Sequence, residues 1–149
     1  MNQKRYVLSV GALVWNDAGQ LLLLLRASGS KYFAGQWEPP GGKALPGEEV
    51  GLTVLREVEE ETGLEVRLEA VAGATEFELP HLRVAMLYFH AHPVAHVPRV
   101  SAEHDDIRWV NPPEINSMNL TEPFRRLLGL HTPWMRHNDD GKSGVNQPK

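Results

Sequence analysis

The first half of the chain carries long hydrophobic runs separated by polar turns. Arg5 to Trp15 is rich in valine and leucine and predicts a strand, and the Asn, Asp and Gly of 16–20 predict a turn into a hairpin. Leu21 to Leu25 is apolar without alternation, which is typical of a strand buried on both faces. Glycine and proline dominate 27–47, where we expect a long loop.

The pattern changes to a helical period after this loop. Val50, Val54, Leu55 and Val58 recur at helical spacing, so we expect a helix over 48–62 that ends at a Gly63 cap. Further elements follow along the chain: strands over 65–78, 82–92 and 107–110, and a helix over 121–130 with Thr121 as its N-cap.

This order of strands, helix, strands and helix predicts a mixed α/β fold in one domain, because 149 residues suffice for a single core. We assign residues 1–130 to that domain. The remainder, 131–149, is mostly polar and rich in Gly, Asn and Asp, and we expect a flexible tail there.

Composition narrows the possible functions. The formal net charge of -4 disfavours broad attraction to duplex nucleic acid or acidic membranes. No cysteine is present, so a metal would have to bind oxygen or imidazole. Neither a signal peptide nor a membrane span is evident, which makes a cytoplasmic location the default expectation.

Glu57, Glu60 and Glu61 stand at i, i+3 and i+4 of the predicted helix and therefore share one face. Like charges at this spacing destabilise a helix, so something must offset the repulsion. Mg²⁺ and Mn²⁺ prefer such oxygen-only clusters, and a bound cation would cancel the repulsion. A merely solvated acidic face is the alternative that spacing leaves open.

The wider segment carries a more specific pattern: Gly42, five residues, Glu48, seven residues, then Arg-Glu-Val at 56–58, one residue, Glu-Glu at 60–61, one residue, and Gly-Leu at 63–64. This spacing resembles the Nudix box at every defined position. The resemblance implies a loop, helix and loop within a Nudix-type α/β/α sandwich with a mixed sheet. It also implies a Mg²⁺-dependent enzyme that cleaves nucleoside diphosphates linked to another group.

The resemblance implies that Glu57, Glu60 and Glu61 bind the metal together with Gly42. Arg56 is a candidate to pair with a neighbouring glutamate and fix its conformation, with an ordinary surface arginine as the alternative.

Supporting residues and the flanking sequence extend the picture. Glu48 could support the metal-binding glutamates from the start of the helix. Upstream, "GQWEPPGGK" is similar to a stretch found in MutT-like members, although Pro39 replaces the usual Phe or Leu.

Three residues are candidates for the general base. Glu103, six residues before Trp109, matches a loop carboxylate that approaches the metal or activates water in MutT-like enzymes. The alternative is that "AEHDDI" is only a solvated polar loop. Glu57 could also take the proton, and His104 could serve instead because an imidazole suits proton transfer near neutral pH.

Substrate contacts are less specified by the sequence. Arg26 and Lys43 are candidates to neutralise phosphates, with plain surface charge as the alternative. Asn119 could reach a base edge, although it lies two places earlier than the corresponding Asn of MutT-like enzymes and suits a helix entry. The histidines of "HAHPVAH" lack the spacing of a zinc site.

We therefore expect a Mg²⁺-dependent Nudix pyrophosphohydrolase, with Mn²⁺ as a possible substitute. A MutT-like nucleoside triphosphate pyrophosphatase that releases pyrophosphate is the first hypothesis. An ADP-ribose or nucleotide-sugar pyrophosphatase is the alternative, and a catalytically silent nucleotide-binding Nudix domain is the second. The expected partner is a small nucleotide; the oligomeric state is left open, with a homodimer possible.

Overall fold

Seven strands and three helices make up the part of the chain that the computed structural model describes, residues 3–129. The strands are β1 (Arg5–Val14), β2 (Leu21–Arg26), β3 (Trp37–Glu38), β4 (Gly41–Lys43), β5 (Glu65–Glu78), β6 (Leu82–Ala95) and β7 (His104–Val110). The helices are α1 (Val50–Thr62), α2 (Pro112–Ile115) and an unlabelled helix over 122–129. The predicted tail over 131–149 lies outside the described residues.

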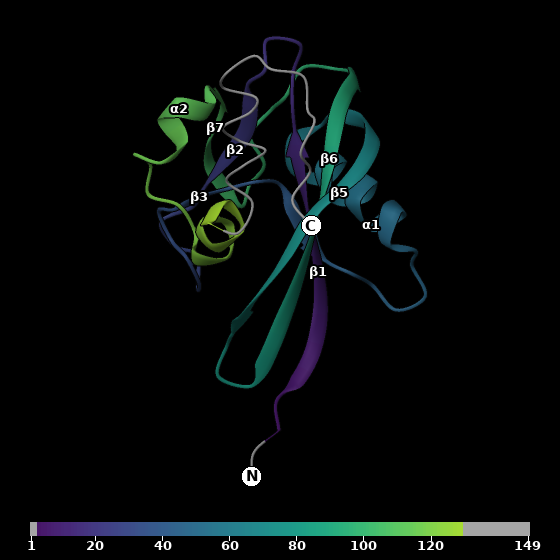
Figure 1. The fold of residues 1–149 in the computed structure, drawn as a ribbon, viewed down its shortest axis with the longest axis vertical. Helices are drawn as coiled ribbons and strands as arrows, with labels where there is room; N and C mark the ends of the chain where they lie inside the picture. The colour runs from purple at the N-terminus through teal and green to yellow at the C-terminus, as the bar shows by residue number, and fades with distance from the viewer. Residues whose placement is uncertain (1–2, 130–149) are drawn as a thin grey trace.

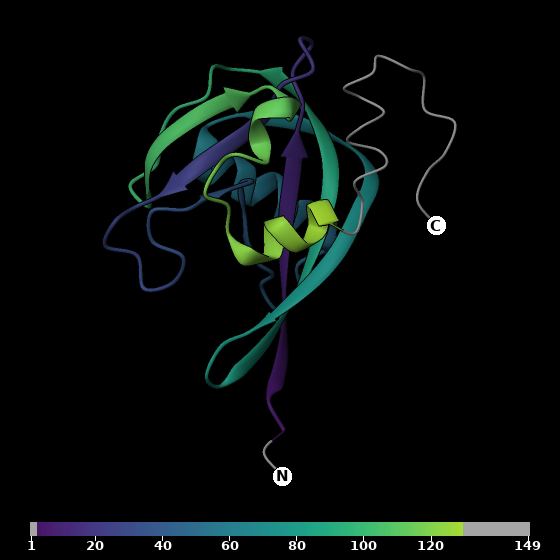
Figure 2. The ribbon, with the colours of Figure 1, turned by 60° about the vertical axis from the view of Figure 1, so that its left-hand side comes forward.

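The strands form two sheets. The larger is mixed, in the order β4-β1-β6-β5, with β1 and β6 parallel and the other pairs antiparallel. The smaller is antiparallel, in the order β3-β2-β7. Both sheets lie between α1 on one side and the 122–129 helix on the other (Figures 1 and 2).

The predicted hairpin of the first two long strands is wrong. The turn over 16–20 forms, and a single bridge joins Trp15 to Leu21, but β1 and β2 then separate into different sheets. Each strand uses both of its edges for other partners, β4 and β6 for β1, and β3 and β7 for β2. The hydrophobic pattern of a strand indicates that it is buried, but it does not specify which strands pair along its two edges.

Burial on both faces explains the unbroken apolar runs. Leu13, Leu21 and Leu23 belong to the core cluster that includes Phe124 of the 122–129 helix. Val10, Ala12, Val14 and Leu22 belong to the other cluster, with Val54 and Val58 of α1. Alternate residues of one strand therefore pack against different helices, and the predicted α/β/α sandwich with a mixed sheet is confirmed.

Other boundaries differ from the prediction. The loop over 27–47 contains β3 and β4, which are too short to carry a periodic pattern, and α2 was not predicted. Helix α1 begins at Val50 rather than at residue 48, while Gly63 caps it in the left-handed conformation as expected. Strand β7 begins at His104, three residues earlier than predicted.

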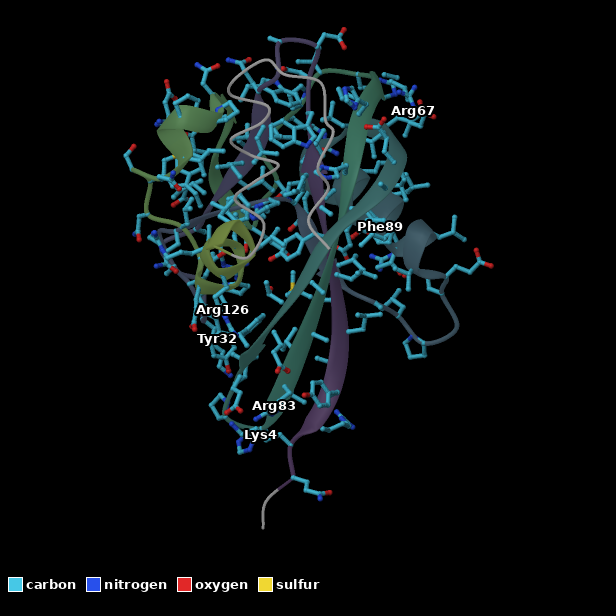
Figure 3. The ribbon with its side chains drawn as sticks, in the orientation of Figure 1. Lys4, Tyr32, Arg67, Arg83, Phe89 and Arg126 are labelled. Carbon is cyan, nitrogen blue, oxygen red and sulfur yellow. The ribbon has the colours of Figure 1, made fainter. Side chains whose placement is uncertain are left out.

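Part of the larger sheet projects beyond the helices. The start of β1 and the β5–β6 hairpin extend away from α1, and Figure 3 shows Lys4 and Arg83 at this end. Both cations pair with Glu78, so they belong to the projection and not to the carboxylate face of α1. Within the described part of the chain, no helix is both long and apolar enough to cross a membrane.

Candidate active site

Glu61 lies at the centre of the candidate site, where α1 packs against Gly41 and Gly42 of β4. Its side chain is almost fully buried, and its Oε1 accepts a 2.7 Å hydrogen bond from the Gly41 backbone N–H. Burial, despite the opposing hydrogen bond from Gly41 and together with the negative charges of Glu38, Glu57 and Glu103, raises the pKa of Glu61 to about 9. A proton or a cation is therefore favoured at this carboxylate.

Glu57 packs directly against the second glycine. A Cβ atom at Gly42 would collide with the Glu57 carboxylate, so only glycine leaves space for that carboxylate as it stands. Burial also raises the pKa of Glu57 despite its contact with Arg56. The glycines of β4 therefore let the sheet and two helix carboxylates approach one another closely.

Arg56 joins three of the predicted carboxylates. Its guanidinium donates to both oxygens of Glu48 at 2.9 and 3.0 Å, to Glu57 at 2.8 Å and to Glu60 at 3.3 Å. The Arg56 hydrogen bonds lower the pKa of Glu48 to about 2, with help from the Thr53 hydroxyl. The arginine therefore compensates part of the repulsion between the glutamates of α1 before any metal binds, and the predicted pairing of Arg56 with a neighbouring glutamate is present.

A second network of polar contacts surrounds the His104 ring, next to Glu61. The buried His104 ring places Nε2 3.2 Å from Glu38 Oε2 and 3.9 Å from Glu61 Oε2, and its Nδ1 is 3.0 Å from the Ser101 hydroxyl. Glu38 Oε2 also accepts a 2.9 Å hydrogen bond from Arg26. Sequence reasoning assigned no role to Glu38 or Ser101, because β3 and the loop before β7 meet only in the folded chain.

Glu103 reaches the same region from the loop before β7. Its side chain is exposed, and its charge acts on both Glu57 and Glu61, whose pKa values it raises. Its backbone is fixed, because its N–H donates to Ser101 Oγ and its carbonyl accepts from the Ala27 N–H. The predicted loop carboxylate thus lies near Glu57 and Glu61 of α1.

Of the three predicted substrate contacts, Arg26, Lys43 and Asn119, only Arg26 lines the cavity of the site. Arg26 lines a cavity next to the carboxylates, but its guanidinium is held by Glu38 and by the Tyr32 carbonyl. Lys43 is exposed at the end of β4, one residue after Gly42. Asn119 is also exposed; its side chain accepts a hydrogen bond from Gln36 and donates to the Gly35 carbonyl, which ties the loop before β3.

The cavity beside the glycine pair has a volume of about 180 Å³. Phe33 and Phe77 form an edge-to-face pair in its wall, with ring centroids 5.4 Å apart. Phe33 has a φ of 57°, a conformation that is rare for a bulky residue. The cavity is lined by both apolar and polar residues: Ser9, Arg26, Tyr32, Phe33, Glu38, Pro39, Gly41, Gly42, Phe77, Leu79, Met86, Tyr88, Thr121 and Pro123.

The carboxylates of Glu57 and Glu61 suit a hard divalent cation, because such cations prefer oxygen ligands. Both pKa values are raised, so a bound cation would stabilise the ionised form of each carboxylate. As the side chains stand, no three His, Asp or Glu groups within residues 3–129 converge on one metal position. Arg56 draws Glu57 and Glu60 toward itself. A metal would therefore require these two carboxylates to turn away from Arg56.

Comparison with known proteins agrees with this geometry. The NUDIX domain family matches residues 5–129. A MutT-like protein from Streptomyces ambofaciens is 32% identical over 120 residues, which cover 80% of this chain and 73% of that protein. A nucleoside triphosphatase NudI from Escherichia fergusonii is 28% identical over 132 residues, which cover 79% of this chain and 91% of that protein.

A solved structure of a MutT protein has the same fold as this chain. The MutT protein of Methanosarcina mazei Go1 superposes with a TM-score of 0.78 and 35% identity, and the match covers 93% of this chain and 96% of that one. The chain belongs to the Nudix hydrolase family, as its sequence pattern suggested. It is a pyrophosphohydrolase acting on nucleoside diphosphate derivatives, in a family that generally uses a divalent metal.

Proposed function

We propose that this chain is a MutT-like nucleoside triphosphate pyrophosphatase, which releases pyrophosphate and a nucleoside monophosphate. The observation that carries the proposal is the cavity, which joins an aromatic wall of Phe33 and Phe77 to the glycine pair above Glu57 and Glu61. A base contacting the rings would leave its phosphates pointing toward the carboxylates. The names of the two relatives above support the same reading.

The proposed cofactor is Mg²⁺, with Mn²⁺ as a substitute. Glu57, Glu60 and Glu61 would hold it together with the Gly42 carbonyl. When bound, the cation would neutralise phosphate charge and make a nearby water more acidic. Because Glu60 is exposed and Glu57 is only partly buried, these two can reorient, whereas Glu61 is fixed by the Gly41 N–H.

The protein's own residues would divide the remaining tasks. Water attacks phosphorus, a carboxylate takes the water proton, and the bond to the leaving phosphate oxygen breaks. Glu57 and Glu103 are the candidates for this base. His104 is less suited, because both of its ring nitrogens already face partners in the buried network. Arg26 and Lys43 remain candidates to contact the phosphates.

Substituting Glu103 tests the choice of base. If Glu103 takes the proton, Glu103→Gln should slow turnover about 10²-fold while the Mg²⁺ concentration for half-maximal activity changes little. Unchanged rates across pH would assign the proton to Glu57. The comparison requires steady-state rates over a Mg²⁺ titration at several pH values.

The substrate class is tested by identifying products. The purified chain is incubated with nucleoside triphosphates, ADP-ribose and nucleotide sugars, in Mg²⁺, Mn²⁺ or EDTA, and the products are separated by chromatography. Release of pyrophosphate from a triphosphate supports the proposal. Two monophosphates from ADP-ribose or a nucleotide sugar would replace it with the alternative, and nucleotide binding without turnover would indicate a silent domain. Glu59→Gln, on another face of α1, is the matched control.

A further inference from the structure

His104 is deeply buried next to two carboxylates of the candidate site, yet it is not among the residues that line the cavity. Its side chain has no exposed surface, and its Nε2 faces Glu38 at 3.2 Å and Glu61 at 3.9 Å. Glu38 lines the cavity, and Glu61 lies beneath Gly41. The ring therefore connects the proposed nucleotide-binding side of the site with its proposed metal-binding side.

The orientation of the ring is set from its other nitrogen. Ser101 Oγ lies 3.0 Å from Nδ1 and also accepts a hydrogen bond from the Glu103 backbone N–H at 3.3 Å. The serine hydroxyl can then donate its proton to Nδ1, which leaves the ring proton on Nε2, where Glu38 Oε2 accepts it. A proton on Nδ1 alone would instead place a bare Nε2 lone pair against the carboxylates.

The backbone also aims this side chain. The pairing of β2 with β7 shifts register between Leu25 and Arg26, so that Arg26 pairs with His104 while Leu25 pairs with Asp106. Such an irregularity redirects the side chains beside it. Arg26 and His104 thereby reach the same oxygen of Glu38 from neighbouring strands.

We propose that His104 is a positioning residue that fixes Glu38 and Glu61 relative to each other, with Ser101 holding the imidazole in the Nε2–H form. The inference rests on the proposed function only for the tests that measure activity; the test of the imidazole tautomer does not depend on it. It gives His104 a role distinct from that of a general base, since its protonated nitrogen is committed to Glu38.

The first test needs neither substrate nor metal. Side-chain nitrogen NMR of the full chain at pH 8 should show His104 with its proton on Nε2, and Ser101→Ala should increase the Nδ1–H fraction. A wild-type ring that carries its proton mainly on Nδ1 would overturn the proposal. This result is independent of whether the chain hydrolyses any nucleotide, so it separates failure of the inference from failure of the proposed function.

The second test compares two substitutions of similar size. In His104→Gln the amide N–H can replace Nε2–H, so kcat should stay within about threefold of wild type. In His104→Leu the donor is lost, so kcat should fall about 10- to 100-fold and the Mg²⁺ concentration for half-maximal activity should rise about 10-fold. A loss of folded protein alone would lower kcat without moving the Mg²⁺ dependence.

A matched control is available in the larger sheet, on strand β6. His92 pairs with Glu69 at 2.8 Å but is partly exposed and away from the site, so His92→Leu should leave both parameters unchanged. Activity of His104→Leu equal to wild type, or activity of His104→Gln as low as that of His104→Leu, would overturn the positioning role. Mn²⁺ binding measured by EPR on the same variants checks the metal effect without turnover.

Discussion

Replacing Glu61 with glutamine removes the charge at the centre of the carboxylate cluster while keeping its shape. The glutamine Oε1 can still accept the hydrogen bond that Gly41 donates to Glu61. What disappears is the titration of a carboxyl group whose pKa is about 9 in the folded chain, compared with its ordinary value of 4.5. The stability of the metal-free protein should therefore depend on pH differently in the variant.

The sign follows from proton linkage. Below about pH 4, Glu61 is protonated in both the folded and unfolded chains, so it adds no pH dependence. Between pH 4.5 and about 9, the folded chain retains a proton that the unfolded chain has released, so the wild type loses stability as pH rises. The slope is up to about 1.4 kcal/mol per pH unit, which accumulates to at most about 3 kcal/mol at pH 7.

The assay is urea unfolding in EDTA at constant ionic strength, from pH 5 to pH 9. The free energy of unfolding of Glu61→Gln minus that of wild type should increase with pH over this range. Glu59→Gln, a substitution of an exposed glutamate on the same helix, should show no such trend. A difference between Glu61→Gln and wild type that stays constant with pH would refute the assigned electrostatics.

Three further predictions concern activity. Glu60→Gln should lower kcat at least about 10²-fold without unfolding the chain, and near wild-type turnover would remove Glu60 from the proposed metal ligands. Gly42→Ala should displace the Glu57 carboxylate and raise the Mg²⁺ concentration for half-maximal activity, while an unchanged Mg²⁺ titration would contradict that contact. Phe33→Ala and Phe33→Gly should both raise KM, with glycine more stable by about 1 kcal/mol in thermal melts because of its positive φ. An unchanged KM in both would remove the Phe33 ring from the nucleotide contacts.

Periodic segments allowed most of the fold to be predicted. Strand β5 agrees with the prediction, and helix α1 differs from it only by beginning two residues later; both segments are long, and the helix has a clear hydrophobic period. Strands β3 and β4 were missed because two or three residues carry no period, and they form only where neighbouring strands provide partners. The separation of β1 and β2 into two sheets is likewise a choice of edge partners that hydrophobicity does not encode.

In the candidate site, too, the sequence predicts residues that are neighbours on one helix but not residues that come together from distant strands. The spacing of Glu57, Glu60 and Glu61 along one helix was readable from sequence because helix geometry relates neighbours directly. Glu38 and His104 are 66 positions apart and meet only because β3 and β7 flank the same strand, β2. No local pattern reports such a meeting.

The contacts of Arg56 also bear on how the chain would bind the proposed metal. Its guanidinium contacts Glu48, Glu57 and Glu60, so the acidic helix has an internal cation before any metal binds. Folding is therefore not expected to wait for metal, in contrast to small domains that are unfolded without it. Chelation should yield a folded but inactive chain, and adding Mg²⁺ back should restore activity without a refolding step.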